Sequence, residues 1–134
     1  MNDKTAHASG KRKRAIARAT ITQGKGIVKI NKIPLDEYNN EPYRLKVLEP
    51  LILAGNITKN LNVDVNVYGG GFSGQAQAAR LAIARAISDY TKDEKLREVF
   101  EEYDRNLVVA DTRRKEVRKP NRSKARAKRQ KSYR

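Results

Sequence analysis

The sequence contains no cysteine and no tryptophan, and it has a single histidine, His7. Without cysteine the chain can form neither a disulfide nor a thiolate metal site, and one histidine does not make a structural zinc site. These absences exclude disulfide-stapled and zinc-finger proteins, and they fit a reducing cytosol. Acid–base catalysis by histidine is not expected either, because His7 lies ahead of the predicted structured region.

Long apolar runs are also missing. The longest is too short to cross a bilayer, and the polar residues 1–10 have no apolar signal-peptide core. We therefore expect a soluble, cytoplasmic chain. The hydrophobic fraction is 38%, with six tyrosines and two phenylalanines, so one modest core of Leu, Ile, Val and Ala is expected.

Basic residues are abundant, and they gather at the two ends of the chain. The net charge is +15 over 134 residues. Residues 1–14 hold five Lys or Arg and one acid, residues 15–112 hold thirteen of each sign, and residues 113–134 hold twelve Lys or Arg and one acid. This predicts a basic N-terminal segment (1–14), a globular domain (15–112) and a basic tail (113–134). A polyanion is the natural partner of such ends.

The body alternates between strand and helix patterns. Residues 15–22 and 27–30 flank a glycine turn and predict a β-hairpin, and the strict alternation of 61–67 predicts a half-buried strand. A helix is expected from about Glu41 to Gly55, interrupted or kinked at Pro50, with Leu45, Leu48, Leu51 and Ile52 inward.

The second half of the body predicts two further helices. Residues 73–89 form the first, with Ala76, Ala79, Ile83, Ile87 and Tyr90 facing the sheet, and residues 92–103 form the second. A short strand is expected at 107–109. These patterns together predict a small α+β domain.

A glycine-rich loop joins the alternating strand to the following helix. Gly69, Gly71 and Gly74 have the spacing of a dinucleotide-binding fingerprint. However, the expected second strand with its acidic residue is missing, and Gln75 stands where a Walker A loop needs lysine. Three interpretations remain open: a nucleotide site, glycines required by tight turning and packing, or a site for an RNA phosphate at a helix N-terminus.

The tail has no apolar periodicity, so it cannot bury a core of its own. Its cations alternate with small residues and repel one another, which favours an extended chain reaching roughly 70 Å. RNA, duplex DNA, an anionic membrane surface and water alone are the candidate environments.

Three stretches together resemble the ribosomal protein S9 family. They are residues 10–20 (GKRKRAIARAT), residues 69–75 (GGGFSGQ) with 80–86 (RLAIARA), and residues 125–134 (ARAKRQKSYR). The similarity covers nearly the whole chain from Gly10. The ending Lys-Ser-Tyr-Arg resembles archaeal and eukaryotic members more than bacterial ones, which usually end in Ser-Lys-Arg.

The resemblance implies a ribosomal-S5-domain-2-like fold, with helices packed on one side of a four-stranded sheet. It also implies a structural, non-enzymatic role in the head of the small ribosomal subunit, beside neighbouring ribosomal proteins and without a cofactor. Contacts with rRNA are expected at Lys11, Arg12, Lys13, Arg14, Arg18, Gly70, Gly71, Ser73, Gly74, Gln75, Arg113, Arg114, Lys115, Arg118, Lys119, Arg122, Lys124, Arg126, Lys128 and Arg129. The tail's end is expected to reach the peptidyl-site tRNA through Lys131, Ser132, Tyr133 and Arg134.

Overall fold

A computed structural model describes residues 4–128 and 130–133. Five strands form one mixed sheet: β1 (Thr5–Arg12), β2 (Ala15–Gln23), β3 (Val28–Ile30), β4 (Ile33–Pro34) and β5 (Leu61–Tyr68). Their order is β1-β2-β5-β3-β4, and β3 pairs with β5 in parallel while the other pairs are antiparallel. In β2 and β5 the buried and more exposed positions alternate, because the helices cover one face of the sheet.

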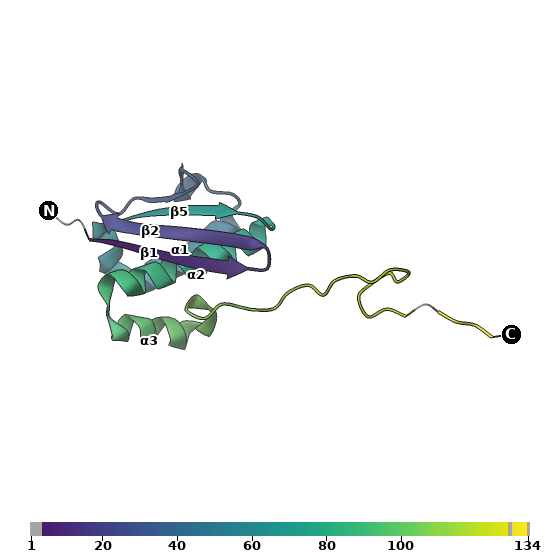
Figure 1. Ribbon diagram of the computed structural model, residues 1–134. Helices are drawn as coiled ribbons and strands as arrows, with labels where there is room; N and C mark the ends of the chain where they lie inside the picture. Colours follow the sequence, from purple (N-terminus) through teal and green to yellow (C-terminus); the bar gives the residue numbers. More distant parts are fainter. Residues whose placement is uncertain (1–3, 129, 134) are drawn as a thin grey trace.

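The helices α1 (Glu41–Ala54), α2 (Phe72–Thr91) and α3 (Glu94–Tyr103) pack on one side of this sheet (Figure 1). Short 3-10 turns, η1 (Leu35–Glu37), η2 (Gly55–Asn60) and η3 (Arg105–Leu107), connect or follow them. The α+β fold class is confirmed, although the sheet has five strands where four were expected. Among the described residues, no helix is both long and apolar enough to span a bilayer.

Small residues allow α2 to lie very close to the first two strands. Ala15, Ala17 and Ala19 of β2 are fully or almost fully buried, as are six alanines of α2. Gly10 of β1 meets the helix backbone itself, since a Cβ there would lie 2.3 Å from the carbonyl oxygen of Ala78. The helix is therefore buried on nearly all sides, with the sheet on one face and α1 and α3 on the other.

The N-terminal segment differs most from expectation. Residues 5–12 were assigned to a basic end ahead of the structured region, but they form β1, paired along its whole length with β2. The predicted hairpin between β2 and β3 is also wrong, because β5 lies between these two strands. The apolar signal in β1 is weak, since alanine and glycine fill its buried positions.

Two further expectations are corrected at the helices. The helix α1 continues through Pro50 without a break, and it buries Val47, Pro50 and Leu51 while Leu45 and Ile52 point outward. Residues 107–109 form no strand, but a 3-10 turn that ends at Leu107. The alternating strand and the long helix are confirmed, and Gly55 ends α1 as its C-cap with a φ of 63°.

The packing at Gly10 predicts a large effect from a small substitution. Gly10→Ser should lower the free energy of unfolding by about 1–3 kcal/mol, because the added atoms force the helix and strand apart. Gly71→Ser is the matched control, since a Cβ at Gly71 meets nothing within 4 Å, and it should change stability by less than about 0.5 kcal/mol. Urea unfolding of both full-length variants, followed by circular dichroism, measures the difference; equal midpoints would contradict this account.

Candidate nucleic-acid interface

Three segments that are far apart in the sequence meet where β1 turns into β2. Lys13 and Arg14 form a two-residue turn between the paired residues Arg12 and Ala15. The pairing of Ile16 with Tyr68 brings the glycine loop that follows β5 beside this turn. Together with the start of the tail these segments enclose a hollow, here called the basic hollow, lined by Arg12, Lys13, Arg14, Tyr43, Gly70, Gly71, Phe72, Ser73, Gly74, Arg114 and Lys115.

Two glycines let the loop close onto the basic turn. Gly69 and Gly70 have φ angles of 76° and 64°, which favour glycine. A Cβ on Gly69 would lie 2.6 Å from the carbonyl oxygen of Arg14, and one on Gly70 would lie 2.9 Å from the backbone nitrogen of Ala15. Gln75 braces the loop, because its Nε2 donates to the carbonyl oxygen of Gly69 at 3.0 Å.

The N-terminus of α2 opens into the same hollow. Its N-cap is Gly71, which has no side chain to accept hydrogen bonds from the first turn. The backbone N–H groups of a first helical turn lack partners within the helix and carry a partial positive charge. With Lys13, Arg14, Arg114 and Lys115 exposed nearby, the hollow combines the features of a phosphate site.

Two aromatic rings on the hollow were not anticipated from the sequence. Tyr43 of α1 and Phe72 of α2 lie with ring centroids 6.3 Å apart at an interplanar angle of 38°. The side chain of Phe72 is exposed although it is large and apolar. The sequence did contain a signal for Phe72. It is an aromatic residue inside a glycine-rich loop, where its ring has no position in the core to fill. Exposed rings of this kind can stack on unpaired bases.

The segment that leads into the tail is anchored to the body. Leu107 and Val108 are buried in the core. Arg85 of α2 donates from Nε to the carbonyl oxygen of Val108 at 2.9 Å and from Nη1 to that of Ser9 at 3.1 Å. Arg85 therefore connects α2, β1 and the segment that leads into the tail.

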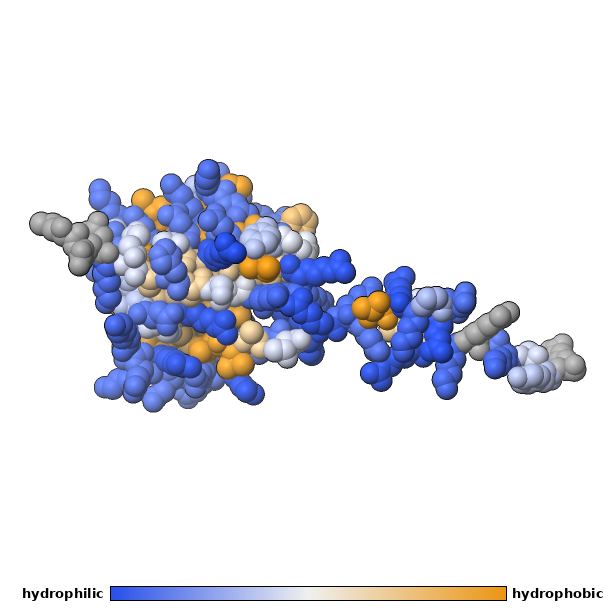
Figure 2. Space-filling model, in the orientation of Figure 1, coloured by the Kyte–Doolittle hydropathy of each residue, from blue (hydrophilic) through white to orange (hydrophobic). Residues whose placement is uncertain are grey.

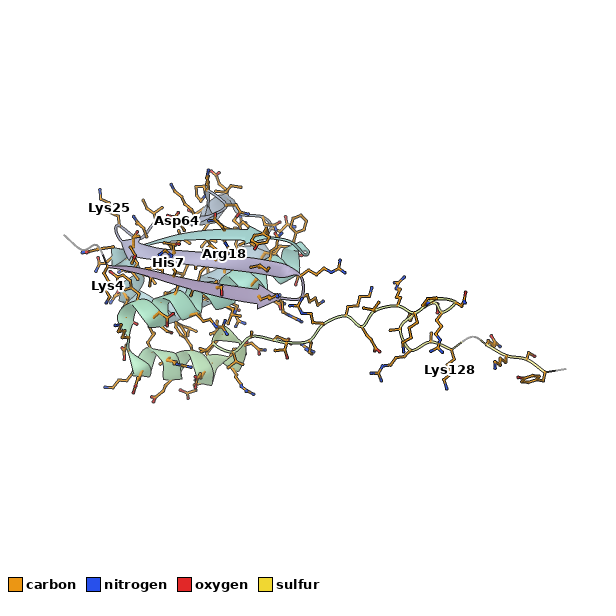
Figure 3. The ribbon with its side chains drawn as sticks, viewed as in Figure 1. Lys4, His7, Arg18, Lys25, Asp64 and Lys128 are labelled. Carbon is orange, nitrogen blue, oxygen red and sulfur yellow. The ribbon has the colours of Figure 1, made fainter. Side chains whose placement is uncertain are left out.

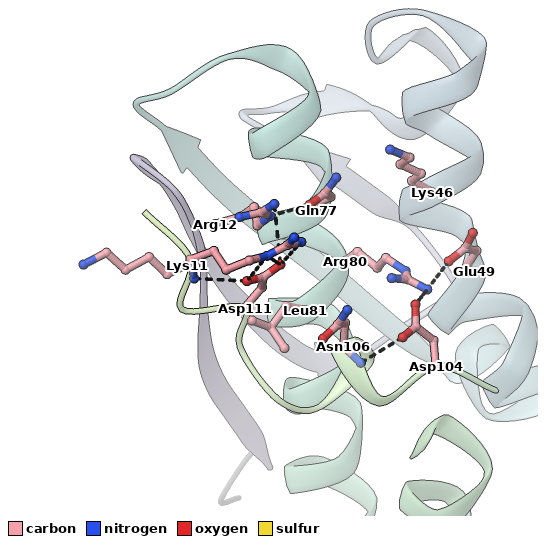
Figure 4. Close-up of a pocket in the computed structure, with 11 residues that line it drawn as sticks. Lys11, Arg12, Lys46, Glu49, Gln77, Arg80, Leu81, Asp104, Asn106 and Asp111 are labelled. Carbon is pink, nitrogen blue, oxygen red and sulfur yellow. Dashed lines mark hydrogen bonds and ion pairs between the residues drawn. The ribbon is translucent and has the colours of Figure 1, made fainter. Parts of the chain in front are cut away.

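A second anchor lies at Asp111, whose side chain is only 15% exposed (Figure 4). Arg113 donates to it from its backbone N–H and from its guanidinium, and Arg12 lies 3.5 Å away. The hydrogen bonds from Arg113 hold the pKa of the Asp111 carboxyl well below its usual range. Arg12 also donates from Nε to Gln77 at 2.8 Å, so its charge is largely engaged within the protein.

Arg80 joins the three helical elements behind the hollow. Its guanidinium pairs with Glu49 of α1 and, at 3.0 Å, with Asp104 just after α3 (Figure 4). The Arg80 side chain is 13% exposed. Because both partners are carboxylates of the protein itself, this arginine fixes the helices in place.

Comparison with known proteins shows the family to which the chain belongs. The family model described as ribosomal protein S9/S16 matches residues 10–134. The chain belongs to this family. It is also 50% identical, over 131 residues, to the small ribosomal subunit protein uS9 of Methanothrix thermoacetophila, with 98% of this chain and 99% of the relative covered. The chain is thus a structural constituent of the small ribosomal subunit.

Not all of the expected rRNA contacts of this S9/S16-family chain lie at the basic hollow. Arg18 is exposed on the face of the sheet that the helices leave open (Figure 3). Lys11 lines a neighbouring depression with Lys46 and Arg80. The Gln75 amide is already engaged within the glycine loop. The structure thus groups the turn, the loop and residues 114–115, and it leaves Arg18 apart.

The tail extends away from the body as a mostly hydrophilic segment (Figures 1 and 2). Its described residues after Val108 form no helix or strand. Arg126 and Glu116 pair at 2.8 Å and close a bend. Exposed side chains include Arg118, Lys119, Arg122, Lys124, Lys128, Lys131, Ser132 and Tyr133. The expected contacts of Arg129 and Arg134 lie outside the described residues.

The alternative of a nucleotide enzyme gains no support from the geometry. The glycine loop leads into α2, and α3 follows where a dinucleotide fold requires a second strand. Two of the loop's glycines are explained by contact with the basic turn. His7, expected ahead of the fold, lies on β1 with its Nδ1 3.1 Å from the hydroxyl of Thr20. Within the described part of the chain, no group of three or more His, Asp or Glu side chains is placed to hold a metal.

Proposed function

We propose that the chain binds small-subunit rRNA through the basic hollow and the tail, and that the end of the tail reaches the peptidyl-site tRNA. The meeting of the turn, the glycine loop and the tail in one hollow carries this proposal. Four exposed cations and an uncapped helix N-terminus surround the space. The phosphodiester backbone of RNA is a ligand with the complementary negative charge.

The aromatic rings suggest how the hollow selects RNA that is not fully paired. Phe72 is 64% exposed and lies beside the loop that would hold a phosphate. Folded RNA offers unstacked bases at its loops and bulges, whereas regular duplex DNA does not. A phosphate in the hollow and a base on Phe72 would therefore favour a single-stranded RNA segment over duplex DNA.

The tail supplies the longer-range part of the interaction. Because Leu107, Val108 and Asp111 are held by the body, the tail leaves from a fixed point next to the hollow. Beyond that point the described cations are exposed, and small residues separate those between Arg122 and Lys128, so its backbone can pass close to crowded phosphates there. Ordering of the tail is then coupled to the folding of the RNA around it.

The contribution of the tail is measured by the salt dependence of binding. If about six tail cations neutralise rRNA phosphates, log K falls with log salt at a slope steeper by about 4–5 than that of residues 1–112 alone. Filter binding of both forms to small-subunit rRNA over a range of salt concentrations gives the two slopes. An unchanged slope after deletion of residues 113–134 would contradict the proposal, and equal affinity for random duplex DNA would favour a DNA-binding protein.

The tRNA contact is tested on assembled subunits. Deletion of residues 131–134 should weaken peptidyl-site tRNA binding on the order of tenfold, the equivalent of one charge-assisted hydrogen bond of about 1.5 kcal/mol. The control replaces Lys124 and Lys128 by alanine, which removes exposed tail cations ahead of the end and should leave tRNA affinity unchanged. Equal tRNA affinity of the deletion and the parent subunits would refute this part of the proposal.

A further inference from the structure

The helix α1 carries apolar side chains on two opposite sides. Val47, Pro50, Leu51 and Ala54 are buried against the rest of the domain. Leu45, Leu48 and Ile52 follow the spacing i, i+3 and i+7, which places them on one stripe of the helix. Leu48 is partly buried against the core, whereas Leu45 is 54% and Ile52 70% exposed, so the described part of the chain leaves the two ends of this stripe uncovered.

The stripe continues into a groove between α1 and the sheet. Leu48 and Ile52 line it from the helix, and Ile27, Val28 and Leu35 line it from β3 and its flanking segments. Ile27, which directly precedes β3, is 48% exposed. A continuous apolar surface of this kind marks an interaction site rather than a solvated face.

The charged residues of the groove indicate the chemistry of its occupant. Two cations, Lys25 and Lys59, line it. Asp36 is the one acid among the residues that line it, and its backbone carbonyl oxygen accepts a hydrogen bond from Nη1 of Arg44 at 2.7 Å. An apolar floor beside a pair of lysines matches a segment whose apolar side chains are followed or preceded by carboxylates.

We propose that this groove docks an apolar segment, with Asp or Glu beside it to face Lys25 and Lys59, of another protein of the small subunit. RNA fits less well, because phosphates and sugars gain nothing from the apolar floor formed by Ile27, Leu48 and Ile52. Lys25 lies at the end of the body away from the tail (Figure 3), so protein and RNA would approach from different sides. The inference rests on the proposed place of the chain in an assembled subunit.

Photo-crosslinking from inside the intact particle tests the docking site. A benzophenone amino acid replaces Ile52 in the full-length chain, and the control carries it at Val99, an exposed apolar residue of α3. Small subunits containing each form are irradiated, digested and analysed by mass spectrometry. Position 52 should yield a peptide of another subunit protein with apolar residues next to Asp or Glu, and position 99 should not yield that peptide.

A charge reversal adds a second readout. Lys25→Glu combined with Lys59→Glu should lower the crosslinking yield at position 52 by about threefold or more, as expected for the loss of two partly exposed ion pairs. Crosslinks from position 52 to RNA, to a second copy of this chain, to a peptide without carboxylates, or to nothing would overturn the inference alone. Absence of the chain from small subunits would overturn the proposed function and the inference with it.

Discussion

The close contact of α2 with β1 and β2 is the constraint on which the rest of the structure depends. A Cβ at Gly10 would lie 2.3 Å from the carbonyl oxygen of Ala78, so the strand and the helix touch through their backbones. Alanine methyl groups fill the remaining contact, and each contributes little by itself. Stability therefore comes from the number and closeness of small contacts, which explains how a chain with few aromatic residues forms a closed core.

The same contact places the surface proposed to bind rRNA. Because β1 lies along α2, the turn at its end meets the N-terminus of that helix and the loop that precedes it. Body arginines such as Arg80 and Arg85 are engaged in holding helices and the tail root together. Among the described cations of the turn and the tail, only Arg113 and Arg126 pair with a carboxylate. The arginines inside the domain thus stabilise the fold, whereas the exposed cations described at its edges are available to a polyanion.

Much of this organisation could be predicted from the sequence because its signals are local. The alternation of apolar and polar residues identified β5, the run of helix-forming residues identified α2, and the density of basic residues identified the tail. The strand β1 was missed because its buried positions are alanine and glycine, whose pattern is indistinguishable from a polar end. The orientation of α1 was misjudged because apolar residues lie on two sides, and the sequence does not say which side a domain buries.

The grouping of the site could be predicted only in part. The basic turn, the glycine loop and the tail were each recognised, but their meeting depends on the pairing of Ile16 with Tyr68 and on the anchoring of Asp111. Both are contacts between residues far apart in the sequence. Tyr43 gave no signal at all, because only the packing of α1 brings its ring beside Phe72.

The central claim is that the loop and the start of the tail face one stretch of rRNA. Single introduced cysteines test it most directly, because the chain has no cysteine of its own. A single cysteine at Ser73 or at Lys115, both exposed, can carry a tethered iron chelate that cleaves nearby RNA backbone in assembled subunits. The account predicts strong, overlapping cleavage from the two positions and none at those nucleotides from Asn56→Cys in η2. Cleavage at unrelated nucleotides, or no rRNA cleavage from Ser73→Cys, would contradict it.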